Sequence, residues 1–227
     1  MNKILILGIT ALASIVLGAC TSQPAQRPLA EQLLASSLHP DTTSAYQQAQ
    51  QNVVEQSSDA DFDTLRALYA GSKYYAPWDT AEHEAGLAIL NAMEDQDYAL
   101  CLTLAQSVLK LNFTNLDAHF GAYNCSRGHD EQTTVFHARV LKGLFKSISN
   151  SGDGNAPETA YMVNSANEAR AFVRLSSLLM FRQESVTEGG RYYHLIFSAH
   201  PTKEDVVELY FDLTKAQLHN FKATELR

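Results

Sequence analysis

Histidine and acidic side chains are the residues with which metal or acid–base chemistry could begin in this chain. The densest group is His129–Glu131 together with His137, and zinc accepts both imidazole and carboxylate ligands. The two acids of this group open a predicted helix, however, where negative charge interacts favourably with the helix dipole. His83-Glu84 would begin the zinc motif H-E-x-x-H, but Leu87 stands where its second histidine belongs. We therefore expect no bound metal and no cofactor.

Nucleophilic catalysis has no linear signature in this sequence. The chain contains no G-x-S-x-G elbow, no phosphate-binding P-loop and no G-x-G-x-x-G dinucleotide motif. Catalytic triads assemble in space, so these missing motifs weigh only weakly against an enzyme. We expect a protein that is not an enzyme, and we assign no catalytic residue.

Two cysteines, Cys101 and Cys125, lie at equal distances from Phe113. If the chain turns at this residue between two antiparallel helices, the cysteines lie at the same height. An oxidising compartment then favours a disulfide, which would stabilise the fold by roughly 3–4 kcal/mol in the chain-entropy account. Two small buried thiols are the alternative, and a metal pair would need further ligands nearby.

An aromatic cluster is the best candidate for a binding surface. Tyr74, Tyr75 and Trp78 crowd a short stretch that follows Gly71. Aromatic side chains give a large contact area at low entropic expense, which suits binding platforms. Such clusters serve more commonly as core anchors beneath a loop, so both roles stay open.

The N-terminus is typical of a bacterial lipoprotein signal peptide over residues 1–19. Lys3 supplies a positive charge, and the apolar segment Ile4–Leu17 is shorter than the roughly 20 residues that a spanning helix needs. Leu17–Cys20 looks like a lipobox, which would make Cys20 the lipid-attachment site; a buried helix or an ordinary signal is the alternative. Several acyl chains would give a stable membrane anchor. Because Thr21 follows the cysteine instead of aspartate, we expect an outer-membrane lipoprotein of the cell envelope, facing the periplasm.

Charge and composition restrict the partners. The chain of 227 residues has a net charge of −8 and no basic cluster, which argues against nucleic acid. Its apolar content of 45% predicts a packed core.

Residues 20–60 are predicted to be a tether with short helices, Leu29–Leu38 and Ala45–Gln56. A folded domain then covers residues 61–222, with a helical part over 61–149. Its stretch Asp97–Ala118 looks like one tetratricopeptide-type (TPR) hairpin, although Phe113 occupies the place of the usual turn proline. The predicted helices are Asp61–Leu68, Asp79 to Met93 after an N-terminal capping box, Asp97–Asn112, Leu116–Arg127 and Glu131–Ser149.

The part from 150 to 222 is predicted to be a small antiparallel sheet with one crossing helix. Asn150–Asn155 reads as a polar turn, and a second capping box, Ser165–Glu168, opens the crossing helix. We therefore expect an α+β fold: TPR-like helical hairpins followed by the sheet. The expected strands are Thr159–Asn164, Leu179–Val186, Tyr192–Ser198 and Glu204–Leu213, with a last helix over Thr214–Phe221.

Several short motifs, in their order and spacing, resemble the bacterial family called domain of unknown function 4919 (DUF4919), over about Asp61 to Leu213. The chain departs from that pattern at Ala70 and Trp78, where tyrosines are usual. The resemblance implies no activity and transfers no catalytic residue. The motifs are Leu65–Gly71, Tyr74–Trp78, Ser151–Gly154, Glu158–Tyr161, Gly189-Gly190 and Leu209–Asp212.

These observations favour a non-enzymatic, membrane-anchored module that binds a protein or peptide of the envelope. A toxin-neutralising, immunity-type lipoprotein is one alternative. An envelope hydrolase whose site assembles in space is the other.

Overall fold

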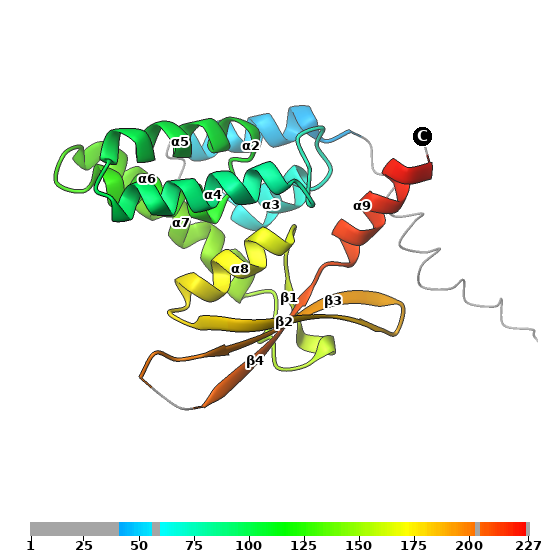
Figure 1. The fold of residues 1–227 in the computed structure, drawn as a ribbon. Helices are drawn as coiled ribbons and strands as arrows, with labels where there is room; N and C mark the ends of the chain where they lie inside the picture. Colours follow the sequence, from blue (N-terminus) through cyan, green and yellow to red (C-terminus); the bar gives the residue numbers. More distant parts are fainter. Residues whose placement is uncertain (1–40, 56–59, 203–204, 226–227) are drawn as a thin grey trace, which may run out of the picture.

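The computed structural model describes residues 41–55, 60–202 and 205–225, with side chains up to residue 220. Figure 1 shows helices α2–α7 gathered in a layer over a four-stranded sheet, with α8 between them and α9 at one side. The predicted α+β class is confirmed. The helices are α2 (Thr43–Val54), α3 (Phe62–Tyr69), α4 (Thr80–Glu94), α5 (Tyr98–Leu111), α6 (Leu116–Ser126), α7 (Glu131–Ser149), α8 (Ala166–Leu175) and α9 (Thr214–Glu225); the strands are β1 (Tyr161–Met162), β2 (Leu179–Glu188), β3 (Arg191–Ala199) and β4 (Val206–Asp212).

Short polar side chains fix where six of the helices begin. In each, a side-chain oxygen just before the helix accepts a hydrogen bond from a backbone N–H of the first turn, which would otherwise lack a partner. Helix starts are therefore readable from the sequence, and α7 has the bounds that we predicted. The capping residues are Asp61, Asp79, Asp97, Asn115, Asp130 and Ser165.

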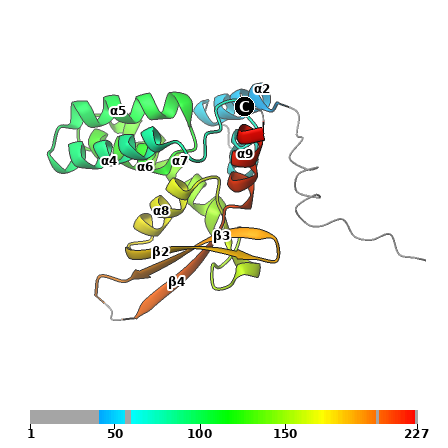
Figure 2. The ribbon, with the colours of Figure 1, turned by 45° about the vertical axis from the view of Figure 1, so that its right-hand side comes forward.

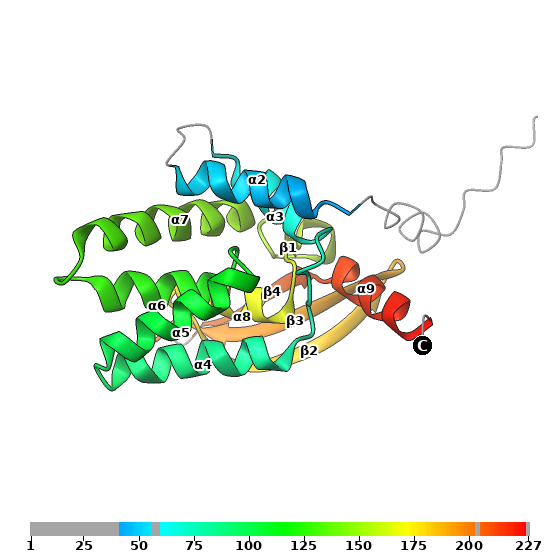
Figure 3. The ribbon, with the colours of Figure 1, turned by 90° about the horizontal axis from the view of Figure 1, so that it is seen from above.

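Helices α4, α5 and α6 pack around a small core of their own, and Figure 3 shows them side by side from above. Cys101 and Cys125 are fully buried there and are joined by the predicted disulfide, with their Cα atoms 6.4 Å apart. The buried face of α5 leaves out two of its leucines. Leu100 and Leu111 are 47% and 64% exposed, because α5 turns Cys101 and Val108, not these leucines, towards its neighbours.

Replacing both Cys101 and Cys125 with alanine is expected to lower the free energy of unfolding by about 2–4 kcal/mol. The bond joins residues separated by 24 positions, so its loss enlarges the conformational entropy of the unfolded chain. Urea unfolding followed by circular dichroism measures the change. The unaltered protein, unfolded in the presence of a reductant, is the matched comparison and should lose a similar amount; a loss well below 1 kcal/mol in both would contradict a structural role.

The sheet is mixed, which corrects the expectation of a purely antiparallel one. Its strand order is β1-β4-β3-β2; β3 is antiparallel to both β2 and β4, whereas β1 is parallel to β4. The reason lies in α8, which crosses the sheet between β1 and β2. The strand–helix–strand connection makes β1 and β2 run in the same direction. The two hairpins that follow reverse the chain twice, so β4 runs in that direction too and lies parallel to β1. The predicted strand Thr159–Asn164 is reduced to the two residues of β1.

Helix α2, which lies within the predicted tether of residues 20–60, packs into the main core. Tyr46 and Val53 of α2 are 2% and 1% exposed and belong to the main core. Their helical spacing with Ala49 is that of a buried face. The predicted helix Leu29–Leu38 lies outside the described residues.

The main core lies between the helical layer and the sheet, and α9 closes it. Figure 2 shows α9 running from the end of β4 back to the level of α2 and α3. Leu213 and Ala216 are fully buried at its start. The indole N–H of Trp78 donates a hydrogen bond to the Ala216 carbonyl over 2.9 Å, which fixes α9 to the loop between α3 and α4.

Candidate functional site

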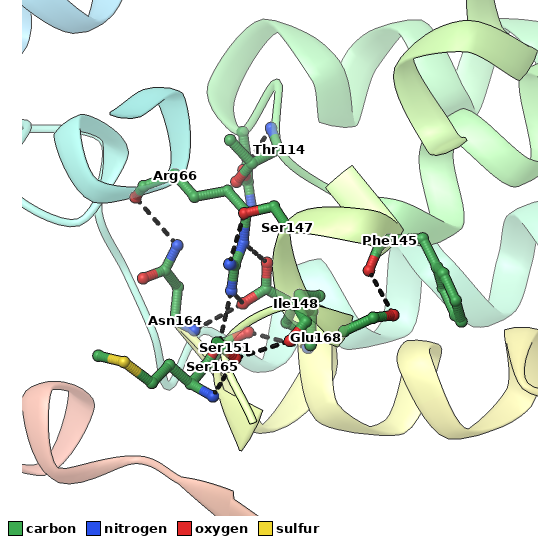
Figure 4. Close-up of polar contacts among 12 residues, drawn as sticks. Arg66, Thr114, Phe145, Ser147, Ile148, Ser151, Asn164, Ser165 and Glu168 are labelled. Carbon is green, nitrogen blue, oxygen red and sulfur yellow. Dashed lines mark hydrogen bonds and ion pairs between the residues drawn. The ribbon is translucent and has the colours of Figure 1, made fainter. Parts of the chain in front are cut away.

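The most connected polar group of the interior is the guanidinium of Arg66, on α3 (Figure 4). It forms a buried ion pair with Glu168, with Nε 3.0 Å from Oε1 and Nη2 3.1 Å from Oε2. It also donates to the hydroxyl of Ser147 on α7 and to the carbonyl of Met162 in β1, over 3.1 and 2.7 Å. One side chain therefore joins α3, α7, α8 and the edge of the sheet.

Glu168 reaches this position because it stands in the first turn of α8. The Ser165 hydroxyl caps that turn by accepting from the Glu168 backbone N–H over 3.1 Å, as the capping-box pattern predicts. The Glu168 carboxylate does not accept a hydrogen bond from the backbone N–H of Ser165, as it would in a complete capping box. Its Oε2 accepts from the backbone N–H of Asn164 over 2.6 Å, and its remaining bonds go to Arg66.

Asn164 and Tyr75 complete the network. The amide of Asn164 donates to the Arg66 carbonyl over 3.1 Å, and the Tyr75 hydroxyl donates to the Asn164 carbonyl over 2.7 Å. Burial raises the pKa of Tyr75 above its ordinary value, so the phenol stays a neutral donor. Among the described residues, no buried side-chain nitrogen or oxygen of this network lacks a hydrogen-bond partner, as buried polar groups require.

An open cavity of about 480 Å³ adjoins this network between α3, the end of α7, β1, β4 and α9. That volume is in the range of small-ligand sites. Two serines lie in its wall, and both are already hydrogen-bonded to structural groups. Ser147 accepts from Arg66, and Ser151 donates to the Ile148 carbonyl over 2.6 Å while accepting from the Met162 backbone N–H. Neither hydroxyl is paired with a histidine or a carboxylate.

The predicted binding residues do not meet on one surface. Tyr75 is 5% exposed and belongs to the core, and half-buried Trp78 anchors α9. Tyr74 is half-buried, accepts a hydrogen bond from Gln47 of α2 and lies beside Lys73. Tyr75 and Trp78 therefore act as anchors of the core, which was one of the two roles considered for the aromatic cluster, and not as an exposed binding platform.

The predicted histidine cluster is also divided. His129 lies against the ring of Tyr98, whereas His137 is paired with His119 of α6, with their Nδ1 atoms 2.9 Å apart. Within residues 41–55, 60–202 and 205–225, no three His, Cys, Asp or Glu side chains are grouped as metal ligands. Sequence reasoning missed His119, which only the packing of α6 against α7 brings to His137.

The tautomers of this pair follow from its third contact. His119 Nε2 lies 2.8 Å from the Phe113 carbonyl, which can only accept, so Nε2 carries the proton. Neutral His119 then accepts at Nδ1, and His137 donates from its own Nδ1. Burial lowers the pKa of His119 to about 3, helped by the neighbouring His137, and burial lowers the pKa of His137 to about 4.

Glu82 is a half-buried carboxyl in the first turn of α4, and its contacts differ from those of a capping box. Asp79 caps α4, but the Glu82 carboxylate accepts from the side-chain amides of Asn112 and Asn115, over 2.9 and 2.6 Å. Burial raises the pKa of Glu82 above its ordinary value, against the lowering effect of both amides. The adjoining cavity of about 10 Å³ holds no ligand larger than a water molecule, so Glu82 joins α4 to the α5–α6 turn.

Cys20 and the signal-like N-terminus lie outside the described residues, so the lipid-attachment prediction has no structural counterpart here. None of the described helices combines the length and the apolar character needed to cross a bilayer.

The fold and site define an α+β domain in which a buried arginine–glutamate network borders an open cavity. Residues 40–222 match the family model described as Domain of unknown function (DUF4919), and the chain belongs to this family. The match begins at residue 40 and so includes α2, in agreement with its buried face. No curated protein and no solved structure matches the chain significantly.

Proposed function

We propose that this protein is a non-enzymatic binding module of the bacterial cell envelope. A lipid on Cys20 anchors it to the outer membrane facing the periplasm, and its ligand is a protein or peptide. The helices α4–α7, stacked as antiparallel neighbours, act as a TPR-like scaffold for the domain.

The observation that carries this proposal is the open cavity of about 480 Å³ beside the Arg66 network. Its walls come from both layers of the fold and are held by the hydrogen bonds of the Arg66 network, so the cavity exists before any ligand arrives. Preorganised walls lower the entropic penalty of binding. The two serines of the wall are committed to structural bonds, which favours binding over the hydrolase alternative.

Site-specific photo-crosslinking in intact cells tests the proposal. A photoreactive amino acid replaces Asn150, an exposed residue at the cavity rim where α7 ends. The matched control replaces Gln132, which is exposed at the opposite end of the same helix, about 27 Å away at 1.5 Å per residue.

We expect one dominant envelope protein or peptide to be captured from position 150 and not from position 132. The capture should disappear in a Cys20→Ala variant, which lacks the anchor. Equal labelling from both positions, or none from either, would contradict the proposal, and capture of a secreted toxin would favour the immunity-type alternative.

A further inference from the structure

Among the residues that the structure describes, Lys215 is the one basic group of the cavity wall without an ion-pair partner. It stands in the first turn of α9, and its side chain is exposed to the cavity. Within the part of the chain that the structure describes, its ammonium group has neither a hydrogen bond nor an ion pair.

The other basic groups of the wall are neutralised by the protein itself. Arg66 is paired with Glu168, and Arg191 with Asp212. Asp212 in addition accepts from the backbone N–H of Thr214 over 2.8 Å. Among the described residues, Lys215 therefore contributes a positive charge that forms no ion pair within the cavity wall.

Apolar atoms cover the wall between the charged groups. Met162 of β1 is 57% exposed, and Val163, Ala67 and Leu218 also line the space. An exposed apolar side chain beside a lysine without an ion-pair partner favours a ligand that joins an anionic group to an apolar one.

Asp63 limits how much negative charge a ligand of the cavity can carry. This residue is exposed in the first turn of α3, lines the same cavity and has no ion-pair partner among the described residues. One lysine and one aspartate offer a phosphate dianion no net attraction to offset its large loss of hydration, so a monoanion, which loses less, suits the cavity better. A carboxylate is the monoanion that peptides carry at their C-terminus.

We infer that the cavity binds the C-terminal carboxylate of a peptide, with Lys215 as its ionic partner and the Met162–Val163 wall against the last side chain. This inference rests on the proposed binding function and names what that site recognises. Capture of terminal carboxylates in this way is a recurring mode of peptide recognition.

The electrostatics of the free cavity agree with this assignment. Crowding by surrounding atoms lowers the pKa of Lys215, and the nearby charge of Arg66 lowers it further. Both effects disfavour the ammonium ion in the empty cavity, and a bound carboxylate would oppose both.

Calorimetric titration of the full mature chain tests the inference. The probes are a pool of random tetrapeptides with free C-termini and the same pool with amidated C-termini. We expect the free-acid pool to bind about tenfold more tightly. Lys215→Met should abolish that difference, Lys215→Arg should restore most of it, and Lys142→Met, which removes an exposed lysine of α7 outside the cavity, should leave it unchanged.

The outcomes separate the two proposals. Equal binding of acid and amide pools would overturn the carboxylate assignment while leaving a binding module in place. Tighter binding of inorganic phosphate than of the acid pool would overturn it as well. No binding of either pool, together with no position-specific crosslink at residue 150, would overturn both.

Discussion

Replacing Glu168 with glutamine is expected to lower the free energy of unfolding by about 3–5 kcal/mol. The exchange conserves the shape of the side chain but leaves the Arg66 guanidinium as an uncompensated charge in the interior. Arg66 and Glu168 are both less than a tenth exposed, so water cannot replace the lost carboxylate. Urea unfolding followed by circular dichroism at neutral pH measures the loss.

The matched control is Glu184→Gln. Glu184 also forms an ion pair, with Arg182 over 2.9 Å, but both side chains are about half exposed on β2. Exposed pairs contribute about 0–1 kcal/mol, so this variant should unfold almost like the unaltered protein. Similar losses in both variants would show that the buried pair has no special structural role.

A double variant separates charge pairing from packing. Arg66→Met alone should also be strongly destabilising, because it leaves the Glu168 carboxylate without its cationic partner and the Met162 carbonyl without its donor from Arg66. Combined with Glu168→Gln, it removes both charges, so the loss should be smaller than the sum of the two single losses. Strict additivity would contradict a direct interaction between the two residues.

The sequence predicts the local elements of this fold well because their determinants are local. A capping residue such as Asp130 followed by an apolar period of 3.6 defines α7 without reference to the rest of the chain. The disulfide was predictable for a related reason. Cys101 and Cys125 are spaced equally about Phe113, so a single turn between two antiparallel helices brings them together. The helix α2 was predicted as Ala45–Gln56, but its place in the main core was not, because the spacing of its apolar residues does not say which elements cover them.

The candidate site depends on contacts between residues far apart in sequence, which no local pattern contains. Arg66 and Glu168 are separated by 102 positions, and the capping box that located Glu168 gave no sign of its partner. In the sequence, Lys215 is an ordinary residue of a predicted terminal helix. Only the packing of α9 against the rest of the domain places it in the cavity wall. Phe113, an anomaly in the repeat pattern, has a physical reason: its backbone N–H donates to the buried Tyr46 hydroxyl over 3.0 Å, and proline has no N–H.

Mild acid is expected to destabilise the protein steeply between pH 6.5 and about pH 4.5. Three buried histidines stay neutral in the folded state, since burial lowers the pKa of His119 to about 3 and those of His137 and His194 to about 4, with the Arg170 charge assisting at His194. In the unfolded chain the same groups bind protons below pH 6.5. The unfolded state therefore gains protons first as the pH falls, and the stability present above pH 6.5 is lost towards the folded pKa values.

Each such histidine contributes up to about 1.4 kcal/mol per pH unit, so the total loss over this interval is on the order of 4–6 kcal/mol. Glu82 acts with the opposite sign: its raised pKa makes the folded protein take up a proton more readily, which offsets part of the loss near the acid end. The exposed aspartates whose pKa values are lowered by hydrogen bonds, Asp41, Asp61, Asp130 and Asp153, lose their contribution only below this interval.

Urea unfolding at a series of pH values, with His137→Asn as the diagnostic variant, measures the effect. The asparagine amide can still donate to His119 from the position of Nδ1, but it cannot take up a proton, so the slope of stability against pH should fall by about one proton. His83→Asn, at an exposed histidine of α4, is the control and should leave the slope unchanged. Stability that is flat down to pH 5, or equal slopes in His137→Asn and the unaltered protein, would mean that the buried histidine pair is not what acid disrupts.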